Sequence, residues 1–246
     1  FGEDNILLSD LVLRMETNNI SDCSLVRSNP YVFRDSLEEN EIQEYLQAGI
    51  CPAGRVTRVE EQYRNLDTRI ISGFDFSARY FVNSDYGNFN FIVNISKLEK
   101  FRQKAGNDFI ELIDAQEKGI IPEELAITGF SDLIEKDGSP KIQANFKFLW
   151  NRGSWGLGLF GRHIGEFYET RNKLSDGRLW KVKAYNTINT FIDYNFKISG
   201  SQSNLRFGIN NIADERAPLA SDIFGYYIDK HDNLGRSYYI NFIHRY

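Results

Sequence analysis

Gly235-Arg-Ser-Tyr-Tyr-Ile-Asn-Phe-Ile-His-Arg-Tyr246 is the stretch that decides the fold, and it ends the sequence. Alternate residues divide it into two sets, because a β-strand has a period of two residues. One set is largely apolar and aromatic: Tyr238, Ile240, Phe242, His244 and Tyr246. The other is mostly polar: Ser237, Tyr239, Asn241, Ile243 and Arg245. A closed membrane barrel uses this pattern, with the apolar side in lipid and the polar side in the lumen.

The same alternation recurs in six further segments. Each has aromatic or aliphatic side chains on one face and mostly polar residues or glycines on the other. The segments are 70–81, 88–96, 141–150, 153–162, 183–196 and 204–210, which with the last strand make seven. Charged residues stand in mid-strand on the non-apolar face, where a lumen would accept them: Arg79, Lys147, Arg162, Asp193 and Arg206.

The connections between these strands alternate in length. Short ones lie at 83–87, 151–153 and 199–203, and long ones at 100–139, 166–179 and 213–234. Outer-membrane barrels have short periplasmic turns and long extracellular loops. The last strand leaves a long connection, so the carboxyl end belongs on the periplasmic side. Four segments are therefore expected outside: 22–52, 100–139, 166–179 and 213–234.

Local patterns refine this arrangement. Trp150 and Trp155 flank one short turn, where an interfacial aromatic girdle would place them. Residues 55–65 are expected to extend the strand at 70–81 beyond the membrane. Within the first long connection, residues 108–117 have the spacing of a short helix. The acidic segment 35–44 is expected to be a solvated loop.

Composition excludes several classes of protein. Hydrophobic residues make up 41% and charged residues 26%, so the chain is neither a helical membrane protein nor disordered. The sequence contains no apolar run of about 18 residues, so it predicts no membrane-spanning helix. The net charge is −5 without a basic stripe, so nucleic acid is not an expected partner.

The chain opens on Phe1 and a mixed segment, 1–19, without a cap or strand start. We expect a piece of a longer protein, or a processed one.

The two cysteines, Cys23 and Cys51, lie in a polar stretch rich in turn residues. A disulfide between them is possible in an oxidising compartment, and two free thiols are the alternative. Neither belongs to a CxxC pair and no histidine is near, so metal ligation is not expected. The three histidines, His163, His231 and His244, lack metal-ligand spacing and are expected to be hydrogen-bonded or exposed.

The sequence contains no motif for catalysis or cofactor binding whose surroundings match those that the motif requires. Gly156-Leu-Gly-Leu-Phe-Gly161 has the GxGxxG spelling of a dinucleotide site. Such a site needs a strand before it and a helix opening at it, whereas the period-two pattern here continues through Arg162. No GxSxG nucleophile motif occurs. We therefore expect no enzyme activity, no cofactor and no metal.

Four passages resemble the C-terminal part of a TonB-dependent outer-membrane receptor. Residues 205–215 (LRFGINNIADE) are similar to its penultimate strand, and residues 232–246 to its terminal strand. Arg64-Asn-Leu66 with Ser72-Gly-Phe-Asp-Phe76 resembles an earlier strand of the family. Cys23…Arg34…Cys51…Gly54-Arg-Val56 resembles the loop that precedes that strand in the family.

The resemblance implies a bacterial outer-membrane barrel of 22 strands, of which about seven or eight are present here. Residues 1–54 would be an extracellular loop region and residues 55–246 barrel strands and loops, with the plug domain absent. The implied function is TonB-dependent uptake of a siderophore–iron complex, cobalamin or a glycan. Partners would be outer-membrane lipid, the N-terminal strands and plug of the same receptor, TonB through the missing N-terminal part, a small-molecule ligand and the barrel-assembly machinery. That machinery would recognise Tyr238, Ile240, Phe242 and Tyr246 as an assembly signal.

Two other classes fit the alternation. A complete small outer-membrane barrel of about eight strands would act as an adhesin or an anchored enzyme. A soluble β-sandwich would act as a binding module, because its strands alternate in the same way.

Overall fold

The computed structural model describes residues 2–61 and 67–245. The chain forms two compact units. Unit 1 comprises Phe1–Arg69 and Arg102–Ser131, and unit 2 comprises Ile70–Phe101 and Asp132–Tyr246. None of the helices within the described residues is both long and apolar enough to cross a membrane.

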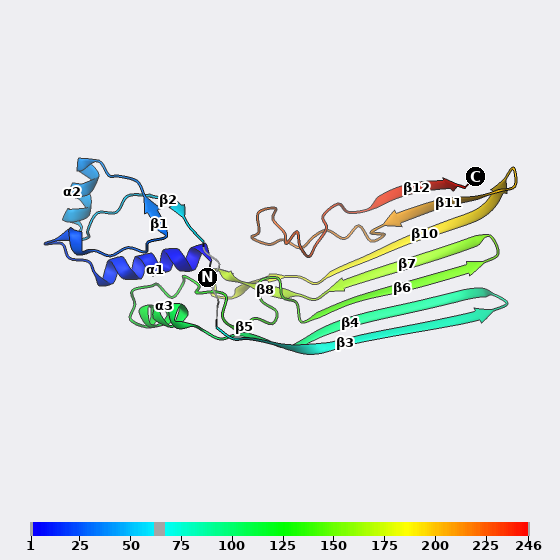
Figure 1. The fold of residues 1–246 in the computed structure, drawn as a ribbon, viewed down its shortest axis with the longest axis horizontal. Coiled ribbons are helices and arrows are strands. Elements are labelled where there is room, and N and C mark those ends of the chain that lie inside the picture. The colour runs from blue at the N-terminus through cyan, green and yellow to red at the C-terminus, as the bar shows by residue number, and fades with distance from the viewer. Residues whose placement is uncertain (1, 62–66, 246) are drawn as a thin grey trace. The chain divides into compact units, whose positions relative to one another are not determined.

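Unit 2 is built on an antiparallel sheet with the strand order β12-β11-β10-β7-β6-β4-β3, and a short strand, β5, pairs with β4. The strands are β3 (Arg69–Ser84), β4 (Gly87–Gln103), β5 (Ser131–Asp132), β6 (Ile142–Arg152), β7 (Trp155–Ile164), β10 (Tyr185–Ile198), β11 (Ser201–Asn210) and β12 (Ser237–His244). The three short turns lie at one end of these strands, and the C-terminus lies at the same end (Figure 1). The seven predicted strands and the all-β class are confirmed.

One face of the sheet is polar, and its side chains bond across the strands. Ser77 Oγ donates a hydrogen bond to Asn94 Oδ1 at 2.8 Å, and Asn94 Nδ2 donates to Asn145 Oδ1 at 2.8 Å. On β10 and β11, the Arg206 guanidinium lies 2.7 Å from Asp193 Oδ2. Such cross-strand pairs stabilise a sheet and fix its register.

Glycines on the polar face make room for aromatic rings. Phe191 lies between Gly158 and Gly208 on the two neighbouring strands. A Cβ on Gly158 would lie 2.2 Å from the Phe191 ring, and a Cβ on Gly208 would lie 2.2 Å from the Tyr239 ring. A ring that covers a glycine restores packing that the glycine lacks. The GxGxxG segment lies in β7, which continues as a strand with no helix opening at it.

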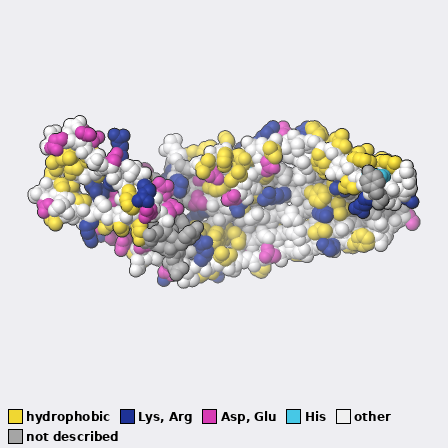
Figure 2. Space-filling view, turned by 45° about the horizontal axis from the view of Figure 1, so that its top comes forward, with side chains coloured by type: hydrophobic (Ala, Val, Ile, Leu, Met, Phe, Trp, Pro, Cys, Tyr) yellow, Lys and Arg dark blue, Asp and Glu magenta, His cyan; other side chains and the backbone are white. Residues whose placement is uncertain are grey.

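The opposite face is apolar and rich in aromatic contacts. The Phe148 ring centroid lies 4.9 Å from that of Phe91, and the Trp155 centroid lies 4.6 Å from that of Tyr194. Near the short turns, the Trp150 indole donates a hydrogen bond to the Tyr86 carbonyl at 2.9 Å. Hydrophobic side chains gather near that end of the strands, at the right of Figure 2. Aromatic residues therefore stand where the sequence predicts a girdle.

The long connections contain structure of their own. In the first, the predicted helix is confirmed as α3 (Asn107–Glu117). The second, expected to be a plain loop, carries a small hairpin of β8 (Phe167–Lys173) and β9 (Leu179–Val182). The sequence pattern missed this hairpin because its strands are short and mixed in polarity.

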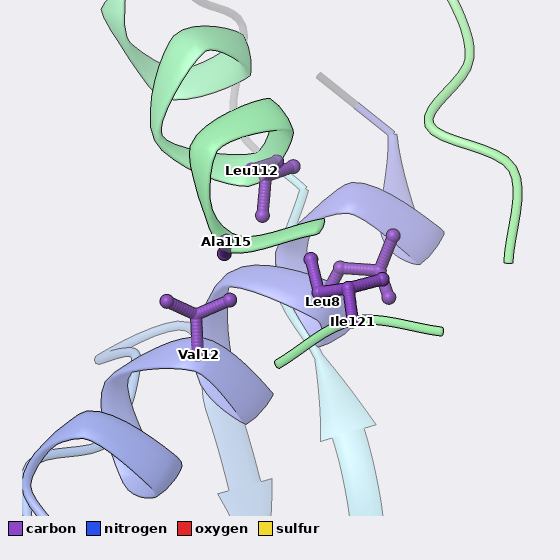
Figure 3. Close-up of a cluster of buried hydrophobic side chains, with 5 residues drawn as sticks. All are labelled: Leu8, Val12, Leu112, Ala115 and Ile121. Atoms are coloured by element: carbon purple, nitrogen blue, oxygen red, sulfur yellow. The ribbon is translucent and has the colours of Figure 1, made fainter. Parts of the chain in front are cut away.

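Unit 1 has a small helical core. Helix α1 (Glu3–Glu16) contributes Leu8 and Val12, which pack against Leu112 and Ala115 of α3 and against Ile121 beyond it (Figure 3). All five side chains are buried. The segment 1–19, whose sequence shows no cap or strand start, is therefore largely helical. The helix has no side-chain N-cap, since Gly2 occupies that position.

The remaining elements of unit 1 are η1 (Cys23–Leu25), β1 (Val32–Arg34), α2 (Glu39–Gln47) and β2 (Val56–Val59). The acidic segment 35–44 is solvated as expected, but much of it is helical. A capping box between Glu38 and Glu41 starts α2. The expectation that residues 55–65 extend the following strand is wrong for β2, which pairs with β1. Residues 62–66 lie outside the described part.

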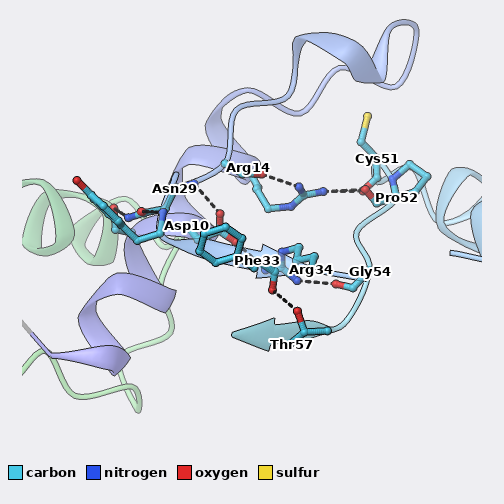
Figure 4. A network of polar contacts seen from close by, with 12 residues as sticks. Asp10, Arg14, Asn29, Phe33, Arg34, Cys51, Pro52, Gly54 and Thr57 are labelled. Atoms are coloured by element: carbon cyan, nitrogen blue, oxygen red, sulfur yellow. Dashed lines mark hydrogen bonds and ion pairs between the residues drawn. The ribbon is translucent and has the colours of Figure 1, made fainter. Parts of the chain in front are cut away.

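A buried ion pair joins α1 to β1 (Figure 4). Asp10 is fully buried, and its Oδ2 lies 2.6 Å from the Arg34 guanidinium. Asp10 Oδ1 accepts a hydrogen bond from the Asn29 backbone at 2.7 Å, and Arg34 donates to the Gly54 carbonyl at 2.8 Å. One helical carboxylate therefore holds two separate segments of the loop region.

Candidate functional site

A hollow opens on the polar face of unit 2, at the end of the strands where the long connections lie. Its volume is about 270 Å³. We call it the outer hollow. The side chains that define it are Phe160, Arg162, Thr187, Asn189, Asn211 and Ser237. They come from β7, β10, the end of β11 and the start of β12, so strand register assembles the site.

Arg162 gives the outer hollow its charge. Its side chain is exposed, and among the described residues it forms no hydrogen bond and no ion pair. Lys147 adds a second cation nearby on the same face, 5.5 Å from the centre of the Phe160 ring. The Asp232 carboxylate at the rim accepts a hydrogen bond from the Leu234 backbone at 2.9 Å. An unpaired guanidinium among amides and hydroxyls suits a ligand with anionic oxygens.

The Asn210-Asn211 dipeptide shapes the wall of the outer hollow. Asn211 adopts the left-handed conformation, with φ at 51°. Its side chain bonds the backbone of Glu215 at both ends, through Oδ1 at 2.9 Å and Nδ2 at 2.7 Å. Its own backbone N–H donates to Asn189 Oδ1 at 2.7 Å. Asparagine tolerates this conformation and closes local turns, so it ends β11 sharply.

Hydrogen bonds hold the segment 213–234 against the strands of unit 2. The Tyr185 hydroxyl donates to the Asp232 carbonyl at 2.6 Å, and the Trp180 indole donates to the Leu219 carbonyl at 2.9 Å. The Ser221 backbone N–H donates to Glu169, a buried carboxylate on β8, at 2.8 Å. The last long connection is therefore an ordered rim beside the outer hollow.

His231 lies buried inside this rim. Its ring stacks on Phe167 with centroids 6.1 Å apart and meets Tyr185 edge-on at 5.3 Å. Burial, and after it the nearby cations Arg162 and Lys230, together lower the pKa of His231 to about 4. Neither ring nitrogen has a hydrogen-bond partner among the described residues. The expectation that each histidine is hydrogen-bonded or exposed is therefore wrong for His231, which acts as a neutral packing group.

The other two histidines lie on the apolar face of the sheet. His163 Nδ1 lies 2.7 Å from Asn186 Oδ1, and His244 Nδ1 lies 2.9 Å from the Ser203 hydroxyl. Among residues 2–61 and 67–245, no three His, Cys, Asp or Glu side chains are grouped as a metal site requires.

Cys23 and Cys51 form a disulfide in unit 1, with their Cα atoms 5.5 Å apart. Arg14, in the last turn of α1, donates hydrogen bonds to the carbonyls of Cys51 and Pro52 at 3.3 and 2.9 Å. The Cys51 backbone N–H donates to Asn18 Oδ1 at 2.9 Å. The bridge therefore lies in a segment that α1 also anchors.

The residues predicted as an assembly signal lie on β12. Tyr238, Ile240 and Phe242 share its apolar face, opposite Ile209, Phe207 and Leu205 of β11. All three are exposed, as lipid-facing residues of an isolated sheet would be. Tyr246 lies outside the described residues. Recognition of this strand by assembly machinery stays a prediction.

The outer hollow itself was not predicted from the sequence. Arg162 had been placed on the polar face, but nothing local relates it to Asn189 or Asn211. The one signal that could have identified the site is the Asn-Asn dipeptide at the end of a predicted strand, because it marks a sharp turn into a long connection.

Comparison with known families agrees with this architecture. Residues 34–212, well over half of the chain, match the family model described as TonB dependent receptor-like, beta-barrel. The match begins at the last residue of β1, covers the strands from β2 to β11 and ends before β12. No curated protein matches the sequence. The family places the apolar face in the lipid of the bacterial outer membrane and the polar face in the barrel lumen. The chain belongs to the TonB-dependent receptor β-barrel family and is barrel sequence of an outer-membrane transport receptor.

Proposed function

We propose that this chain forms part of the wall and outer loops of a receptor for TonB-dependent uptake, and that its outer hollow contacts the ligand. The observation that carries the proposal is the unpaired Arg162 in a lumen-facing hollow beside an ordered loop rim. Small-molecule sites are concave and carry a few convergent polar groups. A ligand captured by the outer loops would meet this hollow on its way inward.

Among siderophore–iron complexes, cobalamin and glycans, the charge of the hollow favours an anionic iron chelate. A guanidinium forms short, charge-assisted hydrogen bonds to carboxylate or other anionic oxygens. A neutral glycan would leave Arg162 desolvated without a counter-charge, which is unfavourable. Asn211 Nδ2 donates to the Glu215 carbonyl and Asn189 Oδ1 accepts from the Asn211 backbone, so Arg162 is the principal charged donor of the hollow.

The test is Arg162→Gln in the complete receptor. Binding of a ferric carboxylate chelate, cyanocobalamin and a neutral oligosaccharide would be followed by fluorescence of the purified protein. We expect the variant to weaken binding of the anionic chelate by about tenfold to a hundredfold, since a hydrogen bond to a charged group contributes about 1.5–3 kcal/mol. Energised uptake of the same chelate by cells should fall in parallel.

The matched control is Arg178→Gln, which removes one positive charge from the turn between β8 and β9. Arg178 is exposed and already paired with Asp176. It should leave binding unchanged. Equal effects of the two substitutions would mean that only net charge matters. Binding of the neutral oligosaccharide alone would exclude the proposed substrate class.

The proposal extends to the domain arrangement and partners. Residues 1–54 would lie outside the cell as a loop region, and residues 55–246 would supply strands and loops of the barrel. The polar face would surround the plug of the same receptor, and TonB would act through the N-terminal part of that receptor. The disulfide between Cys23 and Cys51 supports an exported location for the loop region, because such bridges persist in oxidising compartments.

The last strand would also serve barrel assembly, through Tyr238, Ile240, Phe242 and Tyr246. Replacing Tyr246 by serine removes the terminal aromatic side chain and is expected to lower the level of folded receptor. Heat-modifiable barrel in outer-membrane fractions would be compared for Tyr246→Ser and for Tyr239→Ser, a lumen-facing change on the same strand. An unchanged level in Tyr246→Ser cells would exclude the assembly role.

A further inference from the structure

A second hollow lies on the opposite, lipid-facing side of unit 2, and its volume is also about 270 Å³. We call it the lipid-face hollow. The apolar side chains and glycine that define it are Val93, Ile95, Ala144, Phe146, Gly161 and Ile188. His163 and Asn186 form its polar edge.

Strand register explains why the surface is recessed here. Two rows of residues cross β4, β6, β7 and β10 on this face. The lower row is Val93, Phe146, Gly161 and Ile188, and the upper row is Ile95, Ala144, His163 and Asn186. Gly161 and Ala144 are the small residues among larger neighbours. The Phe146 ring leans over Gly161, where an added Cβ would meet it at 1.9 Å.

The polar edge is unusual for a lipid-facing surface. His163 Nδ1 lies 2.7 Å from Asn186 Oδ1, so an N–H on Nδ1 donates to the amide oxygen. Nε2 of His163 and the amide nitrogen of Asn186 form no hydrogen bond with the described residues. Polar groups left unpaired in hydrocarbon are costly, so a polar partner at this level is favoured.

The height of the pair identifies that partner. From Trp155, at the short-turn end, β7 rises at about 3.4 Å per residue with a tilt of about 40°, so His163 lies about 20 Å higher along the membrane normal. The apolar band of an outer-membrane barrel is about 25 Å tall. His163 and Asn186 therefore lie close to the upper boundary, where hydrocarbon gives way to headgroups. The apolar hollow lies directly below them.

We propose that the lipid-face hollow binds one outer-leaflet lipid, with an acyl chain over Gly161 and Ala144 and a headgroup oxygen accepting from Asn186. Water does not suit the hollow, because an apolar site lacks the two to four polar partners that a buried water needs. The face is already in contact with lipid, so the added stabilisation comes from close packing and the polar contact rather than from hydrophobic transfer. Lys97 follows Ile95 on the same face of β4, and its ammonium lies 2.5 Å from the Glu99 carboxylate on the headgroup side. Because this charge is already paired, the Asn186 amide is the polar contact on which the proposal rests.

The test is retention of lipid by the complete receptor purified from outer membranes in mild detergent. Bound lipid would be counted by native mass spectrometry and identified after extraction. Ala144→Leu fills the hollow, and we expect it to lower lipid occupancy roughly tenfold. Ala78→Leu is the matched control, because Ala78 lies on the apolar face of β3 and outside the hollow. It should retain lipid as the unchanged receptor does.

His163→Phe is the second variant, since it keeps an aromatic ring on the lipid face and removes the polar edge. This variant should also lose lipid. If heat-modifiability shows that Ala144→Leu folds poorly, His163→Phe still tests the proposal. Equal lipid retention in His163→Phe and Ala78→Leu would overturn the proposal. If these variants retain lipid but lose a co-purifying protein, the proposal is overturned and the hollow is a contact site for a protein. Because neither variant alters Arg162, these results are independent of ligand uptake.

Discussion

Replacing Phe148 by arginine is expected to lower the free energy of unfolding of the barrel by about 2–4 kcal/mol, the cost of an arginine on the lipid face near the bilayer midplane. By register, Phe148 pairs with Leu159, which is midway between Trp155 and His163 along β7. The substitution also removes a ring that packs against Phe91. Urea unfolding of the receptor in lipid vesicles, followed by loss of heat-modifiability, would measure the change.

Leu149→Arg is the matched control, because it makes a similar substitution one residue further along the same strand. Leu149 belongs to the polar face, where it pairs with Asn90 and Gly158. An arginine there faces the lumen, so the expected change is less than about 1 kcal/mol. A loss of equal size in both variants would contradict the assignment of the two faces.

The sheet could be predicted because its two faces meet different solvents. Lipid requires apolar side chains at every second residue, and a one-residue slip would move that whole set into the lumen. The period-two pattern in β6 and β10 is therefore direct evidence of a strand. The hairpin of β8 and β9 forms a separate two-stranded sheet whose strands lack this alternation, so the sequence pattern did not reveal it.

Helix α1 and the outer hollow were not predictable for another reason. The buried face of α1 has its partners in α3, about a hundred residues later, and Gly2 supplies no capping side chain as a local signal. The outer hollow depends on which residues of β7 and β10 face one another. Alternation gives the face of Arg162 and of Asn189, but not the register that makes them neighbours.

Breaking the ion pair between Asp10 and Arg34 is expected to destabilise unit 1 strongly. Asp10 has no solvent exposure, while about a quarter of the Arg34 side chain is exposed (25%). Removing one member of a buried pair leaves an uncompensated charge and typically costs about 3–5 kcal/mol. Asp10→Asn keeps the shape of the side chain and removes the charge. It should therefore destabilise the packing of α1 on β1 and on the Gly54 segment.

Hydrogen exchange in the complete receptor would measure this effect locally. In Asp10→Asn, the α1 amides should exchange about a hundredfold faster or more, because losing the ion pair lowers the free energy of local opening by about 3–5 kcal/mol. Glu16→Gln removes one negative charge from an exposed position of the same helix and should leave exchange unchanged. The double variant Asp10→Leu with Arg34→Met replaces the pair by apolar groups and should restore much of the protection. Unchanged α1 exchange in Asp10→Asn would mean that the disulfide and the helical core alone hold α1 in place.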